Sequence, residues 1–295
     1  MKLKKDKNAV ILAHNYQDKE VQEVADIVGD SLKLSLAARE TDADIILFAG
    51  VKFMAEQAKV LNPEKKVLIP DPSSLCSLAA MVNEEMVKEY KERYPDAPLV
   101  VYVNSPIEIK AMADYIVTSA NALDVISKLE SDVVLFSPDS NLANWVAEKT
   151  GKKIITIPPT GHCYVHLLIT GYDVIRMKEK YPDAVVMVHP EVPKEAKRYA
   201  DFIGGTGAMV KFVSKSNARR FLVGTEVGML NRLRREFPKK QFIPIVDKAQ
   251  CIGMKKINIE KVYWSLLDEV YEVEVDQKIA KRVREALERT FALTG

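Results

Sequence analysis

Short apolar runs alternate along the chain with longer stretches in which apolar residues recur at the helical period. Val10–Ala13 and Leu99–Val103 are typical runs, uncharged at every position and rich in branched aliphatic residues. Such continuous runs indicate parallel strands covered by helices on both faces. We therefore predict an α/β fold with short parallel sheets, with strands at 10–13, 45–48, 67–69, 99–103, 133–136, 154–157, 185–188, 221–223 and 242–245.

One sequence pattern occurs three times. Ala25-Asp26 recurs as Ala113-Asp114 and Ala200-Asp201, at offsets of 88 and 87, and the ERYPDA segment at 92–97 is matched by EKYPDA at 179–184. Repeats at a fixed period indicate copies of one structural unit. We predict three homologous three-layer α/β/α units around a pseudo-threefold axis, at residues 1–82, 83–171 and 172–258. A tail at 259–295, with a helix, a strand at 271–275 and a final helix, would pack back on this ring.

The three cysteines share the register of the repeat. Cys76, Cys163 and Cys251 are separated by 87 and 88 residues, so each unit has one. A single free cysteine is usually a buried structural residue, but equivalent placement in three units favours convergence at the axis. Soft thiolates bind zinc or iron–sulfur clusters. Structural zinc needs four ligands, of which a histidine could be the fourth, whereas three thiolates alone fit a 4Fe-4S cluster with one open iron.

Polar residues follow the first strand of each unit, where ligands of parallel sheets bind. They are His14 and Tyr16, Tyr102 and Asn104, and His189 and Glu191. After the next apolar stretch of each unit stands a hydroxyl residue, and we expect Ser31, Ser119 and Thr206 to open helices whose N-termini bind carboxylate or phosphate.

Each of these residues also has an ordinary structural interpretation. A histidine is often a core residue, a tyrosine a strand-edge aromatic, a hydroxyl a helix cap, and a loop glutamate a solvated charge. His162 and His166 flank Cys163, so supporting a metal site is as compatible with them as catalysis.

Charge and composition exclude several classes of protein. The chain has 43 basic and 41 acidic side chains, with a net charge of +2 and no basic face, so we expect no nucleic-acid partner. Its apolar runs stop near five residues, far below the roughly 20 that cross a bilayer, and no apolar signal region follows the basic N-terminus. We therefore expect a cytoplasmic protein without a membrane segment, whose three thiols are reduced.

An ordered set of motifs extends over the whole chain: His14–Gln17 (HNYQ), Gly29–Leu32 (GDSL), Phe53–Glu56 (FMAE), Tyr102–Ser105 (YVNS), Thr118–Ala122 (TSANA), Pro138–Ala143 (PDSNLA), Gly161–His166 (GHCYVH), His189–Glu191 (HPE) and Cys251–Met254 (CIGM). Together they resemble the quinolinate synthase family, the A proteins of bacterial and archaeal NAD biosynthesis. The resemblance implies a central 4Fe-4S cluster with one cysteine ligand from each of three domains.

The resemblance also implies a reaction: condensation of iminoaspartate with dihydroxyacetone phosphate, giving quinolinate with loss of phosphate and two waters. A functional link to an L-aspartate oxidase or dehydrogenase follows, and the open iron would act as a Lewis acid. Substrate would be bound by His14, Ser31, Asn104, Ser119 and Thr206. Proton transfers would be carried by Tyr16, Tyr102, His189 and Glu191. We expect Glu191 to be the principal base, Tyr16 its partner, and Tyr102 close to the open iron.

Two other functions are compatible with the same residues. One is an iron–sulfur redox sensor or carrier that uses the cysteine triad without turnover. The other is a binding protein for a small molecule with free buried thiols. Iron and sulfide analysis of anaerobically prepared protein separates the last of these from the first two.

Overall fold

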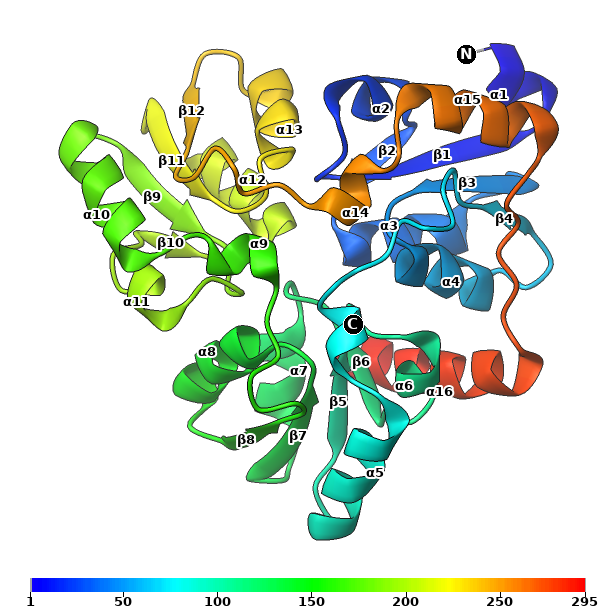
Figure 1. The fold of residues 1–295 in the computed structure, drawn as a ribbon, viewed down its shortest axis with the longest axis horizontal. Coiled ribbons are helices and arrows are strands. Elements are labelled where there is room, and N and C mark those ends of the chain that lie inside the picture. The colour runs from blue at the N-terminus through cyan, green and yellow to red at the C-terminus, as the bar shows by residue number, and fades with distance from the viewer. Residues whose placement is uncertain (1, 295) are drawn as a thin grey trace.

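Three four-stranded parallel sheets surround a common centre in the computed structural model, which describes residues 2–294 (Figure 1). Their strand orders are β2-β1-β3-β4, β6-β5-β7-β8 and β10-β9-β11-β12. Each unit thus has the same topology, with its first and third strands in the middle. The strands are β1 (Ala9–His14), β2 (Ile27–Gly29), β3 (Ile45–Ala49), β4 (Lys66–Leu68), β5 (Leu99–Tyr102), β6 (Tyr115–Val117), β7 (Val133–Ser137), β8 (Lys153–Thr156), β9 (Val185–Val188), β10 (Phe202–Ile203), β11 (Arg220–Gly224) and β12 (Gln241–Pro244).

The predicted α/β class is confirmed, and every predicted strand of the three sheets is present within about one residue of its expected bounds. The structure adds the short edge strands β2, β6 and β10, which the apolar pattern does not distinguish from loops. The first four helices are α1 (Lys2–Asp6), α2 (Lys19–Val24), α3 (Ser31–Glu40) and α4 (Lys52–Leu61). The others are α5 (Glu84–Arg93), α6 (Ile107–Lys110), α7 (Ala122–Lys128), α8 (Ser140–Thr150), α9 (Tyr164–Leu167), α10 (Gly171–Lys180), α11 (Lys194–Lys197), α12 (Thr206–Lys215), α13 (Met229–Glu236), α14 (Ile252–Lys255), α15 (Ile259–Asp268) and α16 (Gln277–Thr294), besides the short 3₁₀ helix η1 (Ala79–Met81).

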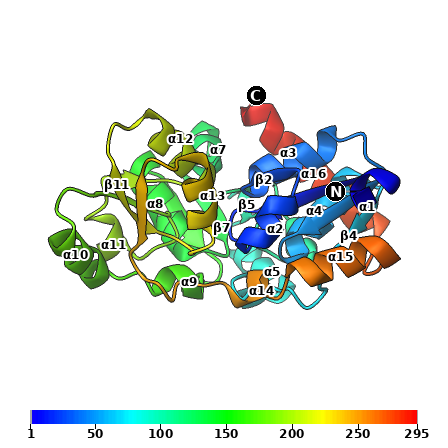
Figure 2. The same cartoon turned by 90° about the horizontal axis from the view of Figure 1, so that it is seen from above.

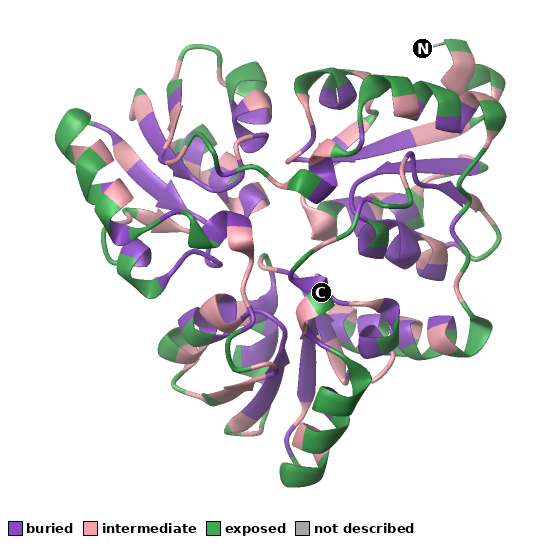
Figure 3. Ribbon diagram, in the orientation of Figure 1, coloured by how far each residue is buried: buried purple, intermediate pink, exposed green. Residues whose placement is uncertain are grey.

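Alternating strand residues face two helical layers in each unit. In the first sheet Leu12 and Ile46 pack with α3 and α4, whereas Ile11 and Leu47 pack with α15 on the other face. Figure 3 shows the buried strands inside all three units and the exposed surface on their outer helices. Burial of both faces explains why the strand sequences are apolar throughout.

The aspartate of the repeated Ala-Asp pair links the first strand of each sheet to the short second strand beside it. Each aspartate carboxylate accepts the backbone N–H of a residue in the first strand at 2.7–2.8 Å, and its own N–H donates to that residue's carbonyl at 2.9 Å. The pairs are Asp26 with Ile11, Asp114 with Leu99, and Asp201 with Val186. The repeat is therefore a structural signal, since this contact fixes the register of the short second strand.

The C-terminal segment packs on two units. Helix α15 lies on the first sheet, while α16 crosses to the second and contacts β6, α6 and α7 (Figure 1). The strand predicted at 271–275 is wrong: Glu272 makes one antiparallel bridge with Leu68. The chain turns there because Glu269 and Tyr271 have positive φ angles of 53° and 66°, which interrupt extended pairing. Between residues 2 and 294, no helix has both the length and the apolarity that crossing a bilayer demands.

Neighbouring units are joined by buried polar side chains at equivalent positions. Lys110 of α6 donates to the Phe53 carbonyl and to Gln57 Oε1, each at 3.2 Å. At the same place in the third unit, Lys197 donates to the Asn141 carbonyl at 2.7 Å. At the same place in the first unit, Gln22 donates to the Gly228 carbonyl at 3.1 Å. Each unit therefore reaches the start of a helix in the next, and the three contacts close the ring.

Burial of Lys110 predicts a pH-dependent stability. Burial lowers the pKa of this lysine from 10.5 to about 7, against the attraction of Glu56 and Cys76. Between these pH values the unfolded chain binds one more proton than the folded chain, so the free energy of unfolding rises with pH, by up to roughly 1.4 kcal/mol per pH unit. Below pH 7 both states hold the proton and the dependence disappears. We expect Lys110→Met to remove this slope.

Denaturant unfolding of both proteins at several pH values from 6 to 10 measures that difference. Other titrating groups are common to the two proteins, so the difference between them isolates Lys110. Equal pH slopes in the wild type and in Lys110→Met would contradict the assignment of a lowered pKa to this side chain.

Candidate active site

All twelve residues expected to act in the site line one central cavity. Figure 2 shows that α9 and α14 lie at one face of the ring and α3, α7 and α12 at the opposite face. The cysteine-bearing loops and the hydroxyl-bearing turns therefore approach the cavity from opposite directions. His166 also lines it, whereas His162 is half-buried outside, with Nδ1 2.8 Å from the Thr160 carbonyl oxygen.

Two of the three predicted hydroxyl residues open helices. Ser31 begins α3 and Thr206 begins α12. Ser119 does not begin one, because it lies in a turn that precedes α7 and in which Asn121 Oδ1 accepts the Thr118 N–H at 2.7 Å. The Asp30 carboxylate caps α3, and neither Ser31 nor Thr206 occupies the cap position. Their hydroxyls are therefore not used as caps.

Backbone amides point at the sulfur of each cysteine. The amides of Leu78 and Ala79 donate to Cys76, that of His166 to Cys163, and those of Gly253 and Met254 to Cys251. Burial nevertheless raises the pKa of each thiol, to about 12 for Cys76. A buried thiol ionises when a cation compensates its charge. Three sulfurs surrounded by amide donors thus suit thiolates bound to metal.

The spacing of possible ligands disfavours a single ion held by all three cysteines. Zinc–sulfur bonds of about 2.3 Å place the sulfurs of a tetrahedral site roughly 3.8 Å apart. Over residues 2–294, the one group of three possible ligands whose donor atoms lie within 4.8 Å of one another is Cys163, His166 and Glu191. At least one pair of the cysteine sulfurs is therefore more than 4.8 Å apart, which is wider than a single tetrahedral site.

In the turns His14–Tyr16 and His189–Glu191, a backbone N–H determines which ring nitrogen of the histidine carries the proton. Nδ1 of His14 accepts the Tyr16 N–H at 3.2 Å, and Nδ1 of His189 accepts the Glu191 N–H at 3.4 Å. Burial lowers the pKa of both histidines to about 3, so both rings are neutral. A neutral ring whose Nδ1 accepts carries its proton on Nε2. Both histidines are therefore Nε2–H donors in the cavity.

Side chains that can only donate hydrogen bonds at these contacts determine which way the hydroxyls of Thr206 and Ser119 point. Arg232 donates to Asn15 Oδ1 at 2.8 Å, so the Asn15 amide nitrogen faces Thr206 Oγ1, at 2.7 Å. Likewise Nε2–H of His189 donates to Ser119 Oγ at 3.2 Å. Both hydroxyl oxygens already accept a hydrogen bond, which leaves each O–H free to donate to a ligand.

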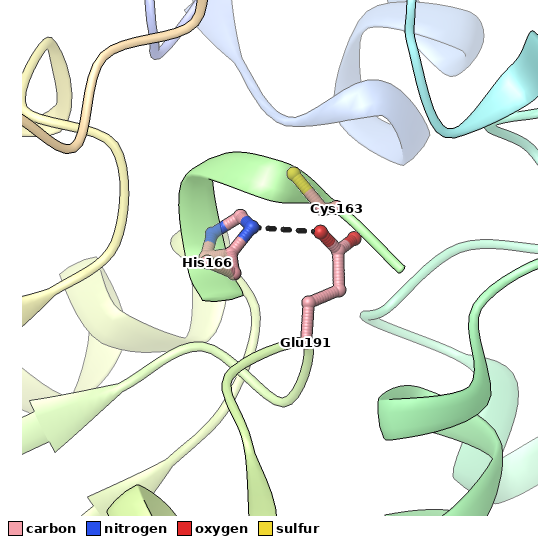
Figure 4. A group of neighbouring side chains, drawn as sticks. All are labelled: Cys163, His166 and Glu191. Carbon is pink, nitrogen blue, oxygen red and sulfur yellow. Dashed lines mark ion pairs between the residues drawn. The ribbon is translucent and has the colours of Figure 1, made fainter. Parts of the chain in front are cut away.

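Glu191 is the centre of a buried hydrogen-bonded cluster. Tyr102 donates its hydroxyl to Oε1 in a short hydrogen bond, and His166 Nδ1 lies 2.8 Å from Oε2 (Figure 4). Burial raises the pKa of Glu191, but the imidazoles of His166 and His189 and the hydrogen bonds from His166 and Tyr102 outweigh it and lower the pKa to about 2. Glu191 is therefore a buried carboxylate, 2% exposed, that is ionised at neutral pH.

Tyr16 reaches Glu191 through other side chains. Tyr102, and not Tyr16, contacts the carboxylate directly among the described residues. The Tyr16 hydroxyl lies 2.7 Å from Thr225 Oγ1, which lies 2.9 Å from His166 Nε2. With the His166 proton on Nδ1 toward Glu191, Nε2 accepts from Thr225, and the Thr225 oxygen accepts from Tyr16. The sequence pattern does not single out Thr225, because its equivalents are Gly50 and Pro138.

Comparisons with known proteins agree with this architecture. Residues 1–292 match the family model described as Quinolinate synthetase A protein. The quinolinate synthase of Thermotoga maritima is 48% identical over 295 residues, which cover 100% of this chain and 98% of that protein. That of Pyrococcus abyssi is 51% identical over 294 residues, covering 100% and 98%. That of Methanocaldococcus jannaschii is 50% identical over 297 residues, covering 99% and 97%.

These matches extend over the three units and over the loops that line the central cavity. The chain therefore belongs to the quinolinate synthase A protein family, enzymes of NAD biosynthesis.

Proposed function

We propose that the protein condenses iminoaspartate with dihydroxyacetone phosphate to give quinolinate, with loss of phosphate and two waters. The observation that carries the proposal is the convergence of three equivalent cysteines and an ionised glutamate on one cavity. The family gives the product, and the cavity has donors for anionic substrates at one face and soft metal ligands at the other. The donors would bind the anionic substrates, and a metal held by the soft ligands would assist dehydration as a Lewis acid.

The proposed cofactor is a 4Fe-4S cluster held by Cys76, Cys163 and Cys251. Its support is the donor set: three thiols, each with amide donors, too widely spaced for one tetrahedral ion. When bound, such a cluster supplies an iron without a protein ligand, which is a Lewis acid for the dehydration steps.

Neutral donors would bind the substrate anions. The O–H groups of Ser119 and Thr206 and the Nε2–H of His14 are directed by their own hydrogen bonds, and Ser31 and Asn104 line the same cavity. Among the described residues that line it, none is lysine or arginine. Hydrogen bonds to charged ligands are strong in a buried site, yet without a cationic side chain the phosphate product would not be retained by a salt bridge.

Glu191 would be the principal base. It is ionised; Tyr102 donates to its Oε1, and His166 Nδ1 lies 2.8 Å from its Oε2. A proton received at the Tyr16 hydroxyl would pass through Thr225 Oγ1 and the His166 ring to Glu191, because neighbouring polar atoms along this path lie 2.7–2.9 Å apart. His189 would hold Ser119 and stack on His166, whose ring centroid is 4.6 Å away.

Anaerobic preparation and assay test this function. We expect about four irons and four sulfides per chain, and quinolinate formation from dihydroxyacetone phosphate and iminoaspartate produced in the same vessel by an L-aspartate oxidase, the class of enzyme proposed to supply it. A cluster that cycles between redox states while no quinolinate forms would instead identify the sensor or carrier. A chain without iron would identify a binding protein with free thiols.

A further inference from the structure

Two buried carboxylates occupy equivalent places beside the cysteine loops. Asp139 lies two residues beyond β7 and Glu226 two residues beyond β11, 87 positions apart. Both side chains are fully buried, with 0% of each residue exposed. Neither belongs to the motif residues expected to bind substrate or metal, so their burial requires another explanation.

The Glu226 carboxylate holds the cysteine loop of the third unit. Oε1 accepts the Cys251 N–H at 3.1 Å and Oε2 accepts the Gly228 N–H at 2.6 Å. Lys255 Nζ lies 3.3 Å from Oε1 and also donates to the Tyr16 carbonyl at 2.6 Å. Cys251 is thus fixed on two sides, by Glu226 at its nitrogen and by the amides of Gly253 and Met254 at its sulfur.

Asp139 occupies the corresponding place in the second unit but makes a different contact. Its Oδ1 accepts the N–H of Leu142 at 2.7 Å, while Oδ2 has no hydrogen-bond partner among the described residues. Cys163 and Cys251 are both N-cap residues of short helices, α9 and α14. The N–H of such a residue has no partner inside its helix, so the Glu226 carboxylate satisfies that of Cys251 and fixes its peptide orientation.

The first unit has no such carboxylate. Val51 stands at the equivalent position, and the Cys76 loop is held instead by Ser74, whose hydroxyl donates to the Gly253 carbonyl at 2.7 Å. The loop of Cys76 therefore rests on the loop of Cys251, which depends on Glu226.

We infer that Glu226 is a positioning residue for the metal-binding cysteines, its carboxylate holding the backbone N–H of Cys251 so that the Cys251 sulfur faces the centre of the ring. The inference rests on the proposed cluster. Outer groups that orient metal ligands typically contribute 10–100-fold to metal affinity. Glu226 holds Cys251 directly and supports the loop of Cys76 through the contact of Ser74 with Gly253.

Cluster retention tests this role without an activity assay. We expect anaerobically prepared Glu226→Ala to lose iron to a chelator 10–100-fold faster than the wild type, followed by the loss of visible absorbance. Glu226→Gln keeps the volume and one acceptor oxygen for two N–H donors, so its rate should be intermediate.

Asp201→Ala is the matched control, since Asp201 also accepts a backbone N–H in the third unit, from Val186, yet holds a strand and no cysteine. It should release iron at the wild-type rate. If Glu226→Ala does not fold, Glu226→Gln decides. A wild-type rate of iron loss in Glu226→Gln would overturn the inference alone. A wild-type chain without iron or sulfide would overturn the proposed function as well, so the two failures are distinguishable.

Discussion

Replacing Cys76 by alanine is expected to abolish the visible absorbance of the anaerobically prepared protein together with its activity. Two thiolates remain in the variant, and the remaining cavity groups offer no soft ligand at the place of the third. The backbone amides of Leu78 and Ala79 also point at the Cys76 sulfur. An alanine side chain offers these amides no acceptor. A cluster with three protein ligands that loses one exposes a second iron, and we expect it to fall apart in a chelator.

Measurement of iron, sulfide and quinolinate formation on the same preparation checks this result. Leu75→Ala is the control, since the Leu75 side chain is 58% exposed beside Cys76 and should be dispensable. An active, colourless Cys76→Ala protein would refute the cluster mechanism. Loss of both properties in Leu75→Ala as well would show that the loop, and not the thiol, is sensitive.

Glu191→Gln is expected to lower kcat by 10²–10⁴-fold, the usual contribution of a positioned base, while iron content stays at the wild-type level. Glutamine keeps an oxygen that can accept from Tyr102, but it cannot take up a proton. Its amide would also face His166 Nδ1, now 2.8 Å from Oε2. The glutamine N–H and the His166 Nδ1–H would then face each other. The His166 proton must therefore move to Nε2, where the ring would donate to Thr225 instead of accepting from it.

Steady-state kinetics with both substrates measure this effect, with KM changing less than kcat because the hydroxyl donors stay in place. Glu195→Gln, on the exposed side of the nearby helix α11, should behave like the wild type. Unchanged kcat in Glu191→Gln would show that another group removes the proton. A proportional loss of iron and kcat would instead assign Glu191 to the support of Cys163.

The repeat made most of the fold predictable. Three copies of an apolar strand pattern predict three sheets, and the common register of Cys76, Cys163 and Cys251 predicts that they lie together; all three line the central cavity. The tail strand was not predictable, because nothing in the sequence marks positive φ at Glu269 and Tyr271, where glycine is the usual residue.

Contacts between units were the other feature that sequence patterns could not give. Lys110 and Lys197 share a residue type, whereas Gln22 stands at the equivalent place of the first unit, so the repeat alone does not reveal their shared role. Thr225 is similar: its role depends on two groups from distant segments, His166 and Tyr16, that approach it only after folding. The partners of these polar side chains can therefore be identified only from the structure.

The construction of the ring from a single chain has a chemical consequence. Three identical subunits around an axis would present the same side chain three times at each height of the cavity. Here the cysteines keep that identity, while Tyr16, Asn104 and Glu191 differ at matching places. The proposed symmetric cluster would therefore have three equivalent ligands, whereas two unlike substrates would each contact a different set of side chains. Covalent linkage of the units thus allows the asymmetry that joining two different molecules in one orientation requires.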